Sequence, residues 1–381
     1  MRLKLISTLC ITVLFTSCVS KKSLPSDVNT SEEKVLEIIN LVNTSWQKNN
    51  PNPGNPFWDN AAYHTGNMAA YAVTKNSTYK EYSEKWAQKN NWKGATSNNK
   101  AEWKYSYGEK PAYVLFGDWQ ICFQTYIDLY NLDEVKDPKK IARAVEVMQY
   151  QMNTPNNDYW WWADGLYMAM PVMTKLYKLT GDEKYLDKLY EYFQFADNLM
   201  FDKDAHLYYR DAKYIYPKHK SVNGLRDFWA RGDGWVFAGL AKVLGDLPKD
   251  NKHYDFFLTR YKQMGVALAK SQQEEGYWTR SILDPTHAPG PETSGTAFIT
   301  YGYLWGMNNG ILDKLEYTPT IQKSWKYLTE FALQADGAVG YVQPIGEKAI
   351  PGQVVNQNST SNFGVGAFLL ASTEMYKFLT K

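Results

Sequence analysis

Two aspartates stand near the expected starts of helices, in segments rich in tryptophan. Asp164 lies in WWWADGLYM and Asp118 lies in FGDWQ. An Asp packed against indole rings loses solvation, which raises its pKa above the usual value of about 3.9, whereas a helix N-terminus lowers it. Two carboxylates held close together take different pKa values and can divide the roles of acid and base. The pattern predicts proton transfer, while an N-cap that accepts backbone N–H bonds is the structural alternative for Asp164.

A third polar residue, Arg231, lies in the phrase FWARGDGWVF. A guanidinium can bind a substrate carboxylate through two parallel hydrogen bonds. The alternative is an ion pair with Asp227 or Asp233 that braces the loop. The sequence leaves both interpretations open.

Aromatic residues are too numerous for a helical core alone, at 14 Trp and 29 Tyr. Tyr and Trp need a partner for their polar atom, so they favour half-buried, wet walls. Sugar rings present apolar C–H faces that stack on such walls. We therefore predict a carbohydrate cleft at the loop ends that carry Trp160, Trp161, Trp162, Trp229 and Trp235.

The elements that must position these residues repeat along the chain. An aromatic helix starts on a short polar loop, a second helix follows, and a short extended tail ends the unit. Internal repetition at this period indicates stacked units, none of which buries its apolar face alone. The repeat places Asp164, Arg231, Asp233 and Thr296 at the same point of successive copies. The copies span residues 163–210, 231–280 and 294–343, and begin 68 and 63 residues apart.

Weaker copies on the N-terminal side bring the count to five helical hairpins. Two terminal helices, at Ser31–Gln47 and Asn362–Leu379, have no partner along the chain. If they pair with each other, twelve helices close into an all-α (α/α)6 barrel. Its inner ring would come from the first helix of each hairpin, which gathers the candidate residues at one mouth. The alternative is an open α-solenoid built from the same hairpins.

The first residues resemble a bacterial lipoprotein leader. Residues 1–17 combine Arg2 and Lys4 with a short apolar stretch, and Cys18 follows where lipidation would occur. Residues 18–30 would then form a lipid-anchored tether, and residues 31–381 a single catalytic domain. Lys21 and Lys22 stand after Cys18 with no acidic cluster, which favours a periplasm-facing protein of the cell envelope. An ordinary secretory signal is the alternative.

Charge and cysteine content exclude several classes of protein. Residues 31–381 carry 38 basic and 39 acidic side chains, so no basic stripe supports nucleic-acid binding. Cys122 is the one cysteine after Cys18, and the five histidines show no metal-ligand spacing. We expect no metal or organic cofactor, and a monomer.

Three segments carry a family resemblance: WWWADGLYMAMPVMTKLY, FWARGDGWVFAGLAKVL and ETSGTAFITYGYLWGMNNG. They resemble glycoside hydrolase family 105, the unsaturated rhamnogalacturonyl hydrolases, and more distantly family 88, the unsaturated glucuronyl hydrolases. The resemblance covers nearly all of residues 31–381, and its W-x-R-G-x-G-W phrase is fairly specific. It also implies an (α/α)6 barrel.

The resemblance implies release of a 4,5-unsaturated uronic acid from the non-reducing end of oligosaccharides made by polysaccharide lyases. One Asp protonates C4 of the enol ether, water adds at C5, and the resulting hemiketal opens. Asp164 matches the acid/base position and Asp118 a second, assisting Asp. The expected substrate-binding residues are Trp162, Arg210, Trp229, Arg231, Trp235 and His64.

Two positions depart from the family pattern. Arg210 stands where many members carry His, so either Arg210 or Arg231 can hold the uronate carboxylate. Asp233 replaces a common Asn. These changes leave open whether the uronide is of galacturonic or glucuronic origin, and which sugar follows it.

Two other functions fit the same sequence features. One is an inverting (α/α)6 hydrolase of intact glycans that uses two carboxylates. The other is a sugar-binding lipoprotein of a glycan uptake system, which would need neither Asp164 nor Asp118.

Overall fold

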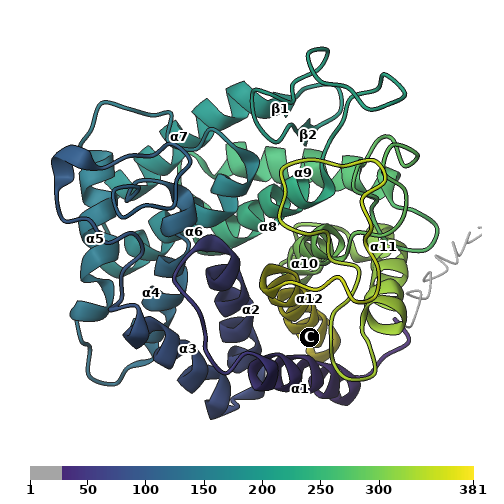
Figure 1. Ribbon diagram of the computed structural model, residues 1–381, viewed down its shortest axis with the longest axis horizontal. Coiled ribbons are helices and arrows are strands. Elements are labelled where there is room, and N and C mark those ends of the chain that lie inside the picture. The colour runs from purple at the N-terminus through teal and green to yellow at the C-terminus, as the bar shows by residue number, and fades with distance from the viewer. Residues whose placement is uncertain (1–27) are drawn as a thin grey trace, which may run out of the picture.

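The computed structural model describes residues 28–381, which form two concentric layers of helices (Figure 1). The inner helices are apolar on nearly all sides, and every residue of the helix at 293–308 is buried. The inner layer is α2 (Trp58–Thr74), α4 (Cys122–Leu132), α6 (Ala163–Thr180), α8 (Ala230–Asp246), α10 (Thr293–Asn308) and α12 (Asn362–Thr380). The outer layer is α1 (Glu32–Asn49), α3 (Ser77–Lys89), α5 (Lys139–Met152), α7 (Lys184–Met200), α9 (Tyr254–Ser271) and α11 (Lys314–Lys326).

The inner layer closes into a ring. Each inner helix packs against the next, and α12 packs against both α10 and α2. The seam lies at Gly66 of α2 and Gly366 of α12, where a Cβ on Gly66 would lie 2.2 Å from the Gly366 carbonyl oxygen. Only residues without a side chain allow this backbone contact. The closed (α/α)6 barrel is therefore confirmed, and the open solenoid is excluded.

The sixth hairpin joins the two ends of the described chain. The first helix α1 packs on the last helix α12, as their lack of sequence neighbours predicted. In this pair the outer helix comes first in the chain, unlike the other five. Figure 1 shows α1 and α12 side by side near the C-terminus.

Backbone bonds fix the register of the three clear repeats. Each extended tail returns to the start of its own inner helix, through Ala163 N–H to Arg210 O (2.8 Å), Ala230 N–H to Arg280 O (3.0 Å) and Thr293 N–H to Tyr341 O (2.9 Å). Asp164, Arg231 and Ser294 are consequently equivalent positions. This corrects the predicted alignment, because Asp233 and Thr296 stand two residues further along their helices than Arg231 and Ser294.

Asp233 and Thr296 share a different task. The Tyr208 N–H donates to Asp233 Oδ1 (2.8 Å), and the Trp278 N–H donates to Thr296 Oγ1 (3.1 Å). Both side chains thus bind the tail of the preceding hairpin. They link neighbouring hairpins of the ring.

Some elements differ from the expected regular helices. Asp118 lies in a 3-10 turn, Gly117–Trp119, that precedes α4, and α11 continues into a π-helical turn, Tyr327–Ala332. A further 3-10 turn spans Lys100–Glu102, and the first tail forms a two-stranded ribbon of β1 (Phe201–Asp202) and β2 (Leu207–Tyr208).

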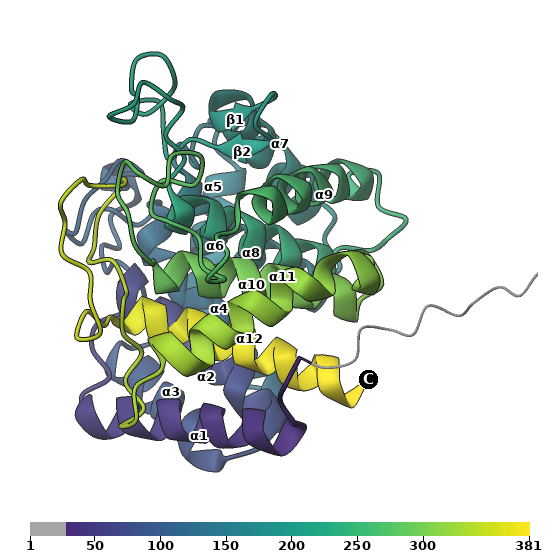
Figure 2. The same ribbon diagram turned by 90° about the vertical axis from the view of Figure 1, so that its right-hand side faces the viewer.

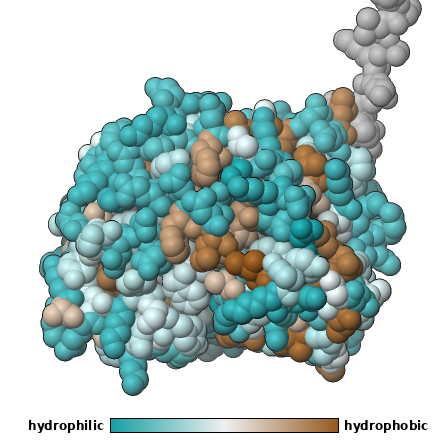
Figure 3. All heavy atoms as spheres, turned by 90° about the horizontal axis from the view of Figure 1, so that it is seen from above, coloured by the Kyte–Doolittle hydropathy of each residue, from teal (hydrophilic) through white to brown (hydrophobic). Residues whose placement is uncertain are grey.

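The long connections lie over the ends of the barrel and not along its outer side. In Figure 2 the yellow segment that precedes α12 lies at one end of the ring. Seen from above, the surface is mostly hydrophilic, with apolar side chains in limited patches (Figure 3).

The expected leader, tether and lipidated Cys18 lie largely outside the described residues. Val28 is already buried against the core, so the packed domain begins slightly before the predicted boundary at residue 31. Within residues 28–381, no helix combines the length and apolarity needed to cross a bilayer.

Candidate active site

The mouth of the barrel collects the first turns of the inner helices. Asp59, Asp118 and Asp164 lie at or next to the start of α2, α4 and α6, with Arg231 at the start of α8. Asp118 and Asp164 are nearly buried, at 6% and 8% exposure. The two acids selected from sequence therefore belong to one site.

The two carboxyls influence each other's ionisation. Burial raises the pKa of Asp118 well above its usual range, and the charge of Asp164 raises it further. Burial also raises the pKa of Asp164, but the Arg210 and Arg231 guanidiniums offset part of that effect. Asp118 accepts no hydrogen bond from residues 28–381. The pair therefore binds a proton more readily on Asp118 while Asp164 faces the arginines.

Asp164 is not an N-cap. The N-cap of α6 is Trp162, and no side chain caps this helix end. Asp164 Oδ2 instead accepts from Arg210 Nε at 3.3 Å. Its own backbone N–H also lowers its pKa, so Asp164 interacts both with the first turn of α6 and with Arg210.

Arg210 connects the acid pair to a loop carboxylate. Its Nη1 donates to Asp211 Oδ2 at 2.6 Å and to Glu347 Oε2 at 3.3 Å. Burial lowers the pKa of Arg210, but Asp164, Asp211 and Glu347 outweigh it and raise the pKa. Its Nη2 group has no hydrogen-bond partner within residues 28–381. One face of this guanidinium is thus available to an anionic ligand.

Arg231 contacts buried groups of the protein and does not face the mouth of the barrel. It is fully buried, and it donates from Nη1 to the Gln343 carbonyl (2.7 Å) and from Nη2 to the Pro344 carbonyl (2.9 Å). Its guanidinium lies over the rings of Trp229 (4.5 Å) and Phe363 (4.8 Å). The alternative in which Arg231 braces a loop therefore describes it better. Its ion-pair partner is Glu292, whose Oε1 lies 3.9 Å from Nη1, and not Asp227 or Asp233.

The tryptophans expected to form the wall are mostly buried. Trp160, Trp162, Trp229 and Trp235 each expose 2% or less. Trp162 packs on Phe116 with ring centroids 4.7 Å apart, and the Trp229 Nε1–H donates to Gln343 Oε1. This burial corrects the prediction that Trp162, Trp229 and Trp235 face a sugar.

Three other indoles are less deeply buried and are candidates for a wall that faces a sugar. Trp58, Trp119 and Trp161 are half-buried and pack around the Phe57, Phe116 and Trp162 cluster. Trp58 lies edge-on to Trp235, with centroids 6.4 Å apart, and so covers it. The prediction of indoles near the acids holds for Trp161, whereas Trp58 and Trp119 were missed.

His64 lies outside the site. It is buried between α2 and α3, where its ring stacks on Trp86 at 3.9 Å and Nδ1 bonds Ser83 Oγ at 2.9 Å. Burial lowers the pKa of His64 to about 3. This neutral packing residue corrects the prediction that His64 binds substrate.

Three residues of the mouth were missed from sequence. Asp59 follows Trp58 at the start of α2 much as Asp118 follows Gly117, so the repeat register would have found it. Phe363 is likewise the second residue of its inner helix, α12, whereas Glu347 lies in a loop of irregular length and carries no comparable signal. Within the part of the chain that the structure describes, no group of three or more His, Cys, Asp or Glu could hold a metal ion.

A closed six-hairpin barrel with a carboxylate pair and indoles at one mouth defines a class of carbohydrate-active enzyme. Residues 22–379 match the model of Glycosyl Hydrolase Family 88. The chain belongs to this family and is therefore a glycoside hydrolase. The sequence motifs had indicated family 105 first and family 88 as a more distant resemblance.

Three proteins are similar to this chain along most of its length. An unsaturated 3S-rhamnoglycuronyl hydrolase of Formosa agariphila is 33% identical over 334 residues, which cover 84% of each chain. A solved glycosyl hydrolase of family 88 from Bacteroides vulgatus is 58% identical with a TM-score of 0.90, and the match covers 92% of this chain and all of the other. A solved structure described as a polysaccharide lyase is 65% identical with the same TM-score, and covers 92% and 99%.

Proposed function

We propose that this protein releases a 4,5-unsaturated uronic acid from the non-reducing end of oligosaccharides produced by polysaccharide lyases. The observation that carries this proposal is the buried pair Asp118 and Asp164 with Arg210 at hydrogen-bond distance from Asp164. Family membership and the Formosa relative support the same reaction.

The proton needed at C4 comes from the carboxyl pair. In the free enzyme Arg210 lowers the pKa of Asp164, so the shared proton stays on Asp118. When a substrate carboxylate neutralises Arg210, this effect weakens, the pKa of both acids rises, and Asp164 holds a proton more readily than in the free enzyme. Substrate binding thereby favours the protonated form of Asp164, which acts as the acid and receives its proton from Asp118.

Hydration then completes the reaction. Asp164 delivers its proton to C4, and the hydroxyl of a water molecule bonds to C5 while the carboxylate pair takes up the remaining proton. The C5 hemiketal opens to a ketone, and C1 then loses the neighbouring sugar as an alcohol, leaving an aldehyde. One water is consumed, and the catalyst recovers its proton.

Arg210 is the residue that we assign to the uronate carboxylate. Both Nη groups of Arg231 already donate to the carbonyls of residues 343 and 344, whereas Arg210 Nη2 is uncommitted within residues 28–381. A planar guanidinium beside the acid also fixes the distance between the carboxylate and C4.

The test follows the absorbance of the conjugated enol ether. Disaccharides prepared with a pectin or rhamnogalacturonan lyase should lose ultraviolet absorbance on addition of the enzyme, and the two products together should be heavier than the disaccharide by one water. Asp164→Asn should lower kcat by about a hundredfold or more, the usual contribution of a general acid. Full turnover by Asp164→Asn would refute the assignment.

The same readout tests the reaction class suggested by the 65% identical relative. A lyase creates the C4=C5 bond, so absorbance would rise on intact polymer instead of falling on its fragments. Release of saturated sugars from intact glycan would indicate the inverting hydrolase. Tight sugar binding without turnover would indicate an uptake protein.

We also propose that the enzyme is a monomer anchored in the cell envelope, facing the periplasm. The basic start, apolar stretch and Cys18 of the leader support lipidation. Palmitate labelling of wild type but not Cys18→Ala would support the anchor, and light scattering of the domain would test the monomer.

A further inference from the structure

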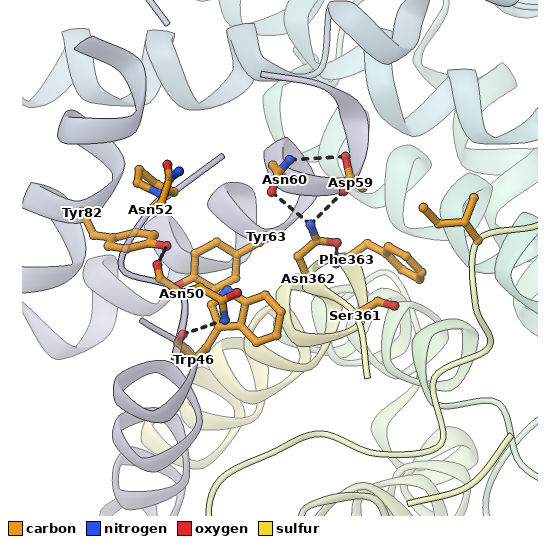
Figure 4. Close-up of a pocket in the computed structure, with 12 residues that line it drawn as sticks. Trp46, Asn50, Asn52, Asp59, Asn60, Tyr63, Tyr82, Ser361, Asn362 and Phe363 are labelled. Atoms are coloured by element: carbon orange, nitrogen blue, oxygen red, sulfur yellow. Dashed lines mark hydrogen bonds between the residues drawn. The ribbon is translucent and has the colours of Figure 1, made fainter. Parts of the chain in front are cut away.

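A cavity of about 270 Å³ lies beside the mouth, between the end of α1, the first turns of α2 and the start of α12 (Figure 4). Aromatic rings form part of its wall, and short amide and hydroxyl side chains form the rest. Its volume falls below the roughly 300 Å³ at which pockets for drug-sized molecules begin, which suits a single sugar ring. The residues that matter here are Trp46, Asn50, Asn52, Asp59, Tyr82 and Ser361.

Several polar groups in this cavity are uncommitted. The Trp46 Nε1–H, Asn50 Oδ1 and Ser361 Oγ have no hydrogen-bond partner within residues 28–381. In contrast, the Tyr82 hydroxyl donates to the Asn50 carbonyl (2.6 Å), which fixes one wall. Free donors and acceptors next to half-buried rings match the alternating hydroxyls and C–H faces of a pyranose.

Charge restricts the occupant. No Lys or Arg lines the cavity, and Asp59 is its one carboxylate. Asn362 Nδ2 donates to Asp59 Oδ2 at 2.9 Å, and Asp59 Oδ1 has only a long 3.5 Å contact from Asn60 Nδ2. A sulfated or uronic sugar would meet repulsion here, whereas a neutral sugar would not.

The cavity adjoins the acid pair. Asp59 lines the cavity, and its charge contributes to the raised pKa of Asp118. Phe363 lines it as well, and the Arg231 guanidinium lies over that ring. Ile345 closes another side directly after Pro344, whose carbonyl Arg231 binds.

We propose that this cavity is the subsite for the neutral sugar that leaves in the reaction, stacked on Trp46 and bound through Ser361 and Asn50. This assignment rests on the proposed function, because it places the uronide at Asp164 and the next ring toward Asp59. It makes the enzyme selective for a neutral residue at that position.

The experiment compares two substrates that share the unsaturated uronide. One carries a neutral sugar as aglycone and the other a methyl group. For Trp46→Ala, the ratio of kcat/KM on the disaccharide to kcat/KM on the methyl glycoside should fall about tenfold, and for Ser361→Ala about fivefold. Ser361 is half-buried at the cavity edge, so its variant tests the subsite even if Trp46→Ala folds poorly.

Phe331→Ala supplies the matched control, since Phe331 is half-exposed and lies outside this cavity. It should leave the ratio unchanged. Absence of wild-type activity on both substrates would refute the proposed function itself. Wild-type activity with unchanged ratios in both variants would refute only the subsite, and equal use of a sulfated aglycone would refute its neutral character.

Discussion

Arg210 Nε lies 3.3 Å from Asp164 Oδ2, and the same guanidinium contacts Glu347 through Nη1. One cation thus joins Asp164 to a loop carboxylate that stands 137 positions after Arg210 in the chain. The electrostatics of the site depend on this connection.

Replacing Arg210 should shift the pH dependence of the reaction. Arg210 lowers the pKa of both Asp164 and Asp118, so Arg210→Met should raise both pKa values. The protonated acid then survives to higher pH, and the alkaline limb of the kcat/KM profile moves upward as kcat/KM itself falls. A profile measured on a lyase-made disaccharide checks this, and an unchanged alkaline limb would contradict it.

Glu347 competes with substrate for Arg210. Its Oε2 also accepts from Lys213 Nζ at 3.0 Å, and Oε1 accepts from the Tyr214 hydroxyl at 2.6 Å. Glu347→Gln removes the charge but retains an acceptor for Tyr214. KM should fall by about two- to fivefold while kcat changes less, as expected for a partly exposed ion pair. A higher KM would show that Glu347 positions Arg210 instead.

Asp233 should destabilise the protein at neutral pH. Burial raises its pKa well above the usual range, and Oδ2 has no partner within residues 28–381. Because the folded pKa is raised, stability is present at low pH and is lost as pH rises toward that pKa. Asp233→Asn keeps an acceptor for the Tyr208 N–H and removes the buried charge.

The free energy of unfolding should therefore increase by about 1 to 3 kcal/mol in Asp233→Asn. The gain should be larger near pH 8 than near pH 5, as measured by urea denaturation. The exposed Asp255→Asn is the control and should show no such pH dependence. A gain independent of pH would argue against the buried charge as its cause.

His64 should matter for stability and not for turnover. His64→Phe retains a ring against Trp86 but deletes the bond to Ser83, so unfolding should become easier by about 1 to 2 kcal/mol. Folded His64→Phe should keep kcat/KM within about twofold of wild type. A large loss of kcat/KM in a stably folded variant would show that His64 does contribute to substrate binding.

The sequence was informative wherever a repeat constrained it. Periodic aromatic helices predicted six hairpins, and their shared starts placed Asp118 and Asp164 in one site. The direction of each side chain was harder to foresee, because Trp162 and Trp229 stand beside the acids in sequence yet pack inward against Phe116 and Gln343.

Loop contacts were beyond sequence reasoning. Nothing in residues 343–347 marks their carbonyls as the partners of Arg231, or Glu347 as a partner of Arg210. These contacts depend on how an irregular segment crosses the mouth. A family motif identifies that Arg231 matters, but only geometry separates a bracing arginine from one that meets the ligand.

The glycine contact between α2 and α12 also has a consequence for biosynthesis. These helices are about 300 residues apart in the chain and touch through bare backbone, so a nascent chain cannot close the ring until α12 has been translated. The hydrogen bond from Asn362 Nδ2 to Asp59 Oδ2 across that joint can form only then. Enzyme activity should accordingly emerge only after α12 has left the ribosome, and removal of α12 should abolish it rather than weaken it.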